Sequence, residues 1–68
     1  MSQKYMVGTK FHNPGKDKSV CMVIDYLITI NLDDEIVKER YVAVHDFCGQ
    51  PVVDNDVTEL RITRGLIV

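Results

Sequence analysis

The chain has 68 residues, of which 46% are apolar, and a formal net charge of −2. This length leaves room for one domain, and the apolar content is typical of a folded protein rather than a disordered one. The small negative charge gives no general attraction to phosphate backbones or anionic lipid. Met1 to Lys4 lack the apolar segment of a signal peptide, and no stretch approaches the ~20 apolar residues that span a bilayer, which predicts a cytoplasmic protein.

The first predicted strand covers residues 4–11, a short stretch rich in strand-forming residues. A loop over residues 12–18 follows it. Asn13, Pro14 and Gly15 indicate a turn there, because proline fixes φ and glycine accepts a positive φ.

The second predicted strand runs from Ser19 to Leu32 and carries an apolar residue at every even position, which predicts that the even residues face the core. Fourteen residues at ~3.3 Å each span about 46 Å, whereas a compact chain of this length is roughly 30 Å across. The strand must therefore bend or project as an arm. Because Cys21, Val23 and Leu27 make part of the odd face apolar as well, we expect a bend near Asp25 to Leu27, as in a strand that coils around a barrel.

The third predicted strand covers residues 35–47 and returns after a tight turn at Asp33-Asp34. This turn predicts a register with Tyr26 opposite Tyr41 and with Ile24 on the inward face opposite Ala43. The other face then gathers a solvated set of side chains with cross-strand charge pairs: Asp25, Thr29, Lys38 and Arg40.

The remaining chain is read as a turn over 48–51, a short strand at Val52-Val53, a turn over 54–56 and a last strand over 57–64. The last segment also resembles a capped helix, since Glu59 follows Asp56 by three residues and Gly65 is placed as a helix stop. Its β-branched residues favour a strand, with one short helical turn near the C-terminus. The predicted fold is mainly β: residues 1–68 form a single small β-barrel domain, a five-stranded antiparallel meander or barrel of SH3-like type.

The back half of the chain carries a resemblance. The segments that carry it are Arg40-Tyr41-Val42-Ala43 with His45, then Gly49-Gln50, then Asp56-Val57 running to Arg64-Gly65-Leu66-Ile67. They resemble small uncharacterised accessory proteins of bacteriophages and prophages. The resemblance covers roughly half of the chain and includes no catalytic motif; it implies an origin in a mobile element and assigns no functional residue.

Two cysteines and two histidines are the residue types of a structural zinc site: His12, Cys21, His45 and Cys48. Their spacing does not fit one, because Cys21 and His12 form no closely spaced ligand pair. We expect a packed histidine and two buried, reduced thiols, with no metal and no cofactor. Cys48 with His45 or His12 could form a nucleophile–base pair, yet the chain carries no known catalytic motif and is too small to offer an obvious cleft, so an enzyme is not predicted.

Charge gives two binding hypotheses. Alternate turns of an antiparallel meander lie at the same end, which would bring five acidic residues to one pole: Asp33, Asp34, Glu35, Asp54 and Asp56. The first hypothesis is that the protein is a protein-binding accessory or modulator module, which docks through this acidic pole on a partner protein with a basic surface. The alternative explanation is that these residues serve only as turn formers. The alternative is a nucleic-acid-binding barrel that uses basic side chains, namely Lys10, Lys16, Lys18, Arg61 and Arg64. A homo-oligomer is compatible with either hypothesis.

Overall fold

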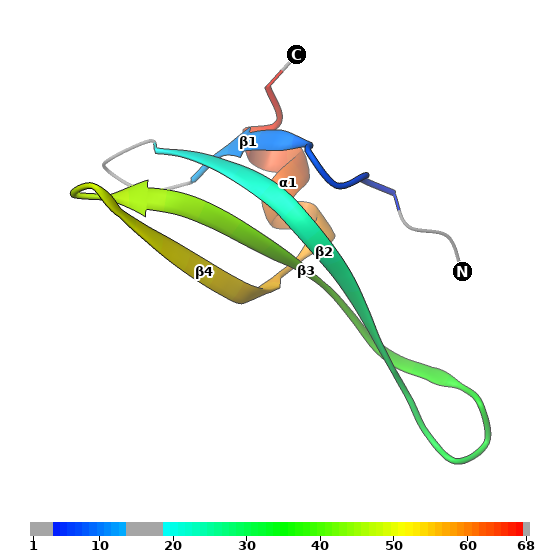
Figure 1. Ribbon diagram of the computed structural model, residues 1–68. Coiled ribbons are helices and arrows are strands. Elements are labelled where there is room, and N and C mark those ends of the chain that lie inside the picture. Colours follow the sequence, from blue (N-terminus) through cyan, green and yellow to red (C-terminus); the bar gives the residue numbers. More distant parts are fainter. Residues whose placement is uncertain (1–3, 14–18, 68) are drawn as a thin grey trace.

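The computed structural model describes residues 4–13 and 19–67 of the chain, which form one antiparallel sheet and one helix (Figure 1). The elements are β1 (Lys10–His12), β2 (Val20–Ile30), β3 (Ile36–Phe47), β4 (Gln50–Val57) and α1 (Glu59–Gly65). The strands lie in the order β1-β2-β3-β4. The mainly β meander is confirmed, but the described residues make four strands in an open sheet and not a five-stranded SH3-like barrel.

The segment after β4 is a helix, so the predicted strand over 57–64 is wrong. Thr58 is the N-cap, and its hydroxyl accepts a hydrogen bond from the Arg61 N–H. Glu59 in the first turn and Arg64 in the last turn complement the helix dipole. The cap and the burial of Ile62 outweigh the strand propensity of the β-branched residues.

Gly65, which closes α1, lies against the backbone of β1. A Cβ on this residue would stand 2.1 Å from the carbonyl oxygen of His12, so only glycine allows this approach. Just beyond it, Leu66 pairs with Phe11 in an isolated bridge and the Ile67 N–H donates to the Lys10 carbonyl. The end of α1 is thereby fixed to β1.

The hydrophobic core lies between the sheet and α1. Its buried members come from every element: Phe11, Cys21, Val23, Tyr41, Ala43, Val57 and Ile62. Tyr5 and Tyr26 pack against this cluster, and the Tyr41 hydroxyl accepts hydrogen bonds from the backbone of Lys4 and Tyr5. The core therefore draws on both the N-terminal segment and the C-terminal helix.

A β-bulge at Ile24 divides β2 into two halves. Between Asp25 and Thr29 the register is the predicted one, with Tyr26 opposite Tyr41. Before Asp25 the register shifts by one residue, so Val23 pairs with Ala43 and Ile24 is the extra residue.

The bulge reverses which residues of β2 face the core. Val23 is fully buried while Ile24 is 37% exposed, and Val20 and Met22 are exposed as well. The prediction that the even residues Val20, Met22 and Ile24 face the core is therefore wrong. The strand is irregular at Ile24, one residue before the range in which a bend was expected.

β4 extends through the segment that was predicted to be a turn. Asp54 lies opposite Ala43 and Val57 lies opposite Tyr41, so β4 uses one more residue than β3 over this stretch. The carboxylate of Asp54 accepts a hydrogen bond from the Asp56 N–H. The sequence Asp-Asn-Asp thus forms a bulge within a strand, since the same side chain–backbone bonds that close turns also serve bulges.

The far end of β2 and the start of β3 leave the core as a two-stranded arm, here defined as residues 25–40 (Figure 1). The molecule measures 43 × 24 × 19 Å, and its radius of gyration is 12.9 Å against about 11 Å for a compact chain of this length. The long strand is irregular and also projects, so the expectation of a bend in place of an arm is wrong.

Candidate functional site

The tip of the arm is an ordered loop with three acidic residues, Asp33, Asp34 and Glu35, next to Leu32. We call residues 32–35 the acidic tip. Asn31 organises it: its Oδ1 accepts from the N–H groups of Asp33 (2.9 Å) and Glu35 (3.0 Å), and its Nδ2 donates to Glu35 Oε1 (3.1 Å). The Asn31 N–H also donates to the Glu35 carbonyl, so the turn is one residue longer than the predicted Asp33-Asp34 turn.

The backbone of the acidic tip is fixed, whereas its side chains are fully presented to solvent. Asp34 adopts a positive φ of 60°, which aspartate tolerates better than most residues. Leu32 is 104% exposed, and Asp33 to Glu35 are exposed. A leucine held in this way on a rigid loop contributes nothing to the core of its own chain.

One face of the arm is apolar and continues from the core. Tyr26 packs on Tyr41 with ring centroids 4.8 Å apart, and the strand alternation places Ile28, Ile30 and Ile36 beyond it. These three isoleucines are 41% to 55% exposed. We call Tyr26, Ile28, Ile30 and Ile36 the apolar face of the arm.

The opposite face of the arm is polar, as predicted. Thr29 lies opposite Lys38, and the Arg40 guanidinium donates to the Thr29 hydroxyl at 3.2 Å. The arm is therefore amphipathic, like a strand pair that is covered on one side only.

A carboxylate interrupts the apolar face. Glu39 lies opposite Ile28, and one of its carboxylate oxygens is buried without a hydrogen-bond partner among the described residues. Partial burial raises the pKa of the Tyr26 hydroxyl, and the neighbouring Glu39 carboxylate raises it further. The hydroxyl stays protonated at neutral pH, so the only charge on this face is negative.

Asp54 and Asp56 lie on β4 and are not part of the acidic tip. Asp54 lies opposite Ala43, seven residues along β3 from Ile36, or about 23 Å of strand. Asp56 forms an ion pair with Lys38 (3.2 Å), and Asp54 forms one with Arg61 (2.6 Å). The expectation of one five-residue acidic pole is therefore wrong, because the presumed turn over 54–56 is part of β4; only Asp33, Asp34 and Glu35 gather.

The ion pair between Asp54 and Arg61 joins α1 to the sheet. The Arg61 hydrogen bond, followed by the Asp56 N–H, lowers the pKa of the Asp54 carboxyl below its usual 3.8. Arg61 also donates to Asn13 Oδ1 at 3.0 Å, so one guanidinium connects α1 with β4 and with the residue after β1.

Asp54→Asn is expected to weaken the dependence of stability on acid. A carboxyl whose pKa is lowered by folding contributes stability that is complete above 3.8 and is lost as the pH falls through the folded pKa. The wild type should therefore lose more unfolding free energy than the variant between neutral and strongly acidic pH, as measured by urea denaturation at each pH. Asp46→Asn, an exposed carboxylate on β3, is the control and should keep the wild-type slope.

The basic residues that the nucleic-acid hypothesis invokes do not lie together on one exposed surface of the described residues. Lys16 and Lys18 lie outside the described residues. Lys10 on β1 and Arg64 at the end of α1 are exposed, whereas Arg61 is half-buried and committed to Asp54 and Asn13. In the described part of the chain, these residues do not provide the continuous basic groove that this hypothesis requires.

The cysteines and histidines are also separated. Cys21 is buried in the core and lies opposite His45 in the β2–β3 pair. Cys48 is exposed in the β3–β4 turn with a φ of 53°, so the expectation of two buried thiols holds for Cys21 and is wrong for Cys48. Within residues 4–13 and 19–67, no three His, Cys, Asp or Glu side chains come close enough to hold a metal ion.

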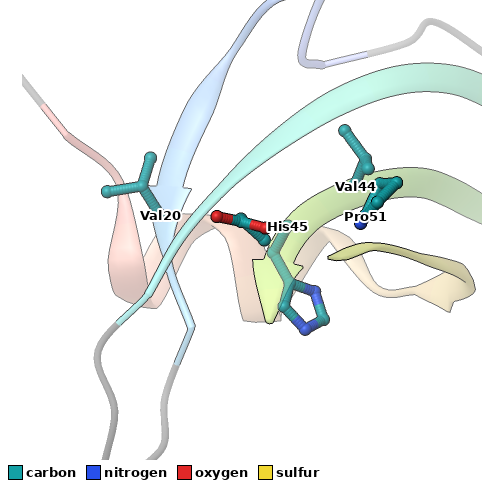
Figure 2. A pocket seen from close by; sticks show the side chains of 5 residues that line it. Val20, Val44, His45 and Pro51 are labelled. Carbon is teal, nitrogen blue, oxygen red and sulfur yellow. The ribbon is translucent and has the colours of Figure 1, made fainter. Parts of the chain in front are cut away.

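A hollow lies by the start of β2, the end of β3 and the start of β4, and Figure 2 shows the side chains around it. It is lined by Val20, Val44, His45, Asp46 and Pro51, and its volume of about 260 Å³ lies below the range of about 300 to 1,000 Å³ that is usual for ligand pockets. His45 and Asp46 are adjacent in β3, so their side chains point to opposite faces of the sheet and form no acid–base pair.

No protein-family model, curated protein or solved structure matches the chain. In the described part of the chain, no helix is long and apolar enough to cross a membrane. The arm with its acidic tip is therefore the candidate site on geometry alone.

Proposed function

We propose that this protein is a protein-binding accessory module that docks on a partner protein through its arm. The observation that carries the proposal is the arm itself: β2 and β3 continue beyond the core as a two-stranded hairpin with an exposed apolar face, joined to β4 by the ion pair between Lys38 and Asp56. A two-stranded hairpin is marginal in water on its own, and contiguous exposed apolar side chains mark interaction surfaces. A partner that covers this face would stabilise the arm.

The chemistry of the arm specifies the partner surface. Leu32 and the apolar face require an apolar groove, and the acidic tip together with Glu39 requires basic residues around it. This is the usual anatomy of an interface, with an apolar centre and a charged rim that steers association. The Asn31 hydrogen bonds order the tip before binding, which lowers the entropic cost of docking.

A modulator role suits this anatomy better than an enzyme role. The described residues offer no nucleophile beside a base in a cleft, since Cys21 is buried and Cys48 lies on an exposed turn. The resemblance to phage and prophage accessory proteins supports an origin in a mobile element. In this proposal the protein binds and modulates a cytoplasmic partner that has a basic surface.

Two variants of the acidic tip test the proposal: one should change the association rate and the other the dissociation rate. The first replaces Asp33, Asp34 and Glu35 with Asn, Asn and Gln, which keep the turn geometry because Asn tolerates the positive φ and Gln can still accept from Asn31. It should slow association with the captured partner about tenfold at low salt and much less at high salt. The second, Leu32→Ala, should mainly speed dissociation.

The control is Val53→Ala, which removes an exposed apolar side chain (59%) from β4, outside the arm. The partner is first captured from host lysate with the wild type, identified, and then measured by surface plasmon resonance against each variant. If both tip variants bind with wild-type rates, or if Val53→Ala weakens binding as much, the arm is not the docking site.

A further inference from the structure

We infer that two copies of this chain join through the edge of β2 in the arm, and that the two sheets continue across a twofold axis. The occupant of this edge is thus a second copy of the chain. The inference does not depend on the proposed function, because it concerns the backbone edge of the arm and not its apolar face or its acidic tip.

The edge is open. β1 pairs with β2 only at Val20 to Met22, and the backbone of Gly8 and Thr9 reaches only to Val23. From Asp25 to Ile30, β2 has β3 on one side and no strand on the other among the described residues. The Tyr26 N–H is taken by the Asp25 carboxylate at 2.8 Å, which indicates that Tyr26, and by alternation Ile28 and Ile30, direct their backbone groups away from β3.

From Leu27 to Ile30 the edge is also unprotected, unlike the other open edges that the structure describes; the Asp25 carboxylate, which accepts from the Tyr26 N–H, lies at the inner end of this stretch. β4 carries Pro51, two aspartates and a bulge, and the arm edge of β3 carries Lys38, Glu39 and Arg40. These are the features with which proteins prevent edge pairing. Residues 26–30 of β2 (Tyr-Leu-Ile-Thr-Ile) have no charge, no proline and high strand propensity, the composition of a segment that pairs with another strand.

The sequence of this edge is complementary to itself. An antiparallel pair about a twofold axis that sets Ile28 opposite Ile28 of the second copy also sets Tyr26 opposite Ile30 and Leu27 opposite Thr29. All residues of one face then meet residues of the same face. The only charge on the edge, Asp25, comes opposite Asn31 and not opposite another carboxylate.

Sedimentation equilibrium of the wild type and two lysine variants tests the inference. The wild type should show a concentration-dependent mass that rises to twice 7.8 kDa. Ile28→Lys places like charges opposite each other across the twofold axis and should remain at the monomer mass. Ile36→Lys adds the same charge on β3, at a residue of similar exposure (41% against 44%), and should still form the dimer.

Each outcome decides the question once circular dichroism has shown that the variants are folded. A wild type that stays at 7.8 kDa at every concentration overturns the inference. Loss of the dimer in both lysine variants also overturns it, because the copies would then meet through the apolar face. If Ile28→Lys does not fold, Ile28→Pro replaces it, since proline removes the outward N–H and leaves the ladder with β3 intact.

Discussion

Val23→Asp is expected to unfold the protein, while Ile24→Asp, one residue further along β2, is expected to leave it folded. Val23 is fully buried among core side chains, and an unpaired carboxylate there costs several kcal/mol. A small domain has a total stability of only about 5 kcal/mol, so the variant should show no cooperative transition. Ile24 is 37% exposed, so its carboxylate would remain in contact with water.

Circular dichroism and urea denaturation of the two variants, at one protein concentration, measure this difference. The comparison is well matched because the residues are neighbours of similar size and strand propensity. The opposite result, with Ile24→Asp unfolded and Val23→Asp tolerated, would mean that β2 runs without a bulge and that its even residues face the core.

Phe11→Ala is expected to lower the free energy of unfolding by about 3–5 kcal/mol, which is most or all of the stability of a domain of this size. Phe11 is 0% exposed and lies on β1, where it also pairs with Leu66 after α1. Removing its ring leaves a cavity between the sheet and the helix.

Phe47→Ala is the control for this prediction. Phe47 is 57% exposed at the end of β3, so its truncation should change the unfolding free energy by less than about 0.5 kcal/mol. The urea midpoints of both variants are compared with the wild type at equal protein concentration, because any dimer would add to apparent stability. Similar losses in the two variants would show that Phe11 is not in the core.

The register between β2 and β3 could be predicted from the sequence only in the arm. There the charged residues Lys38 and Arg40 occupy one face and the isoleucines the other, so a slipped register would bury charge. Before Asp25 both faces are apolar, since Val20, Cys21, Met22, Val23 and Ile24 follow one another. Either the odd-numbered or the even-numbered residues of this run could fill the core, so burial energy alone could not locate the bulge.

The C-terminal helix and the candidate site show the same limit. Asp56 and Thr58 both suit an N-cap, which favours a helix, whereas the β-branched residues after them favour a strand. The segment is a helix because Ile62 is then buried against the sheet, and this packing could not be predicted from the local sequence. The gathering of Asp33, Asp34 and Glu35 could be predicted because they are neighbours in one turn. The placement of Asp54 and Asp56 could not, because the same residue types form turns and bulges. The length of the second strand required either a bend or an arm, and it could not decide between the two.

The contacts of α1 with the N-terminal part of the chain also bear on the order in which the molecule is expected to fold. Tyr5 and Thr63, whose hydroxyls are hydrogen-bonded, are separated by 58 residues, whereas β2–β3 and β3–β4 are hairpins between neighbouring segments. The loop-closure entropy is greatest for the most distant contact, and such contacts slow folding. We therefore expect the sheet to form from local pairs while the ring of Phe11 still has no cover, and the core to close last, when the C-terminal helix reaches the N-terminal strand.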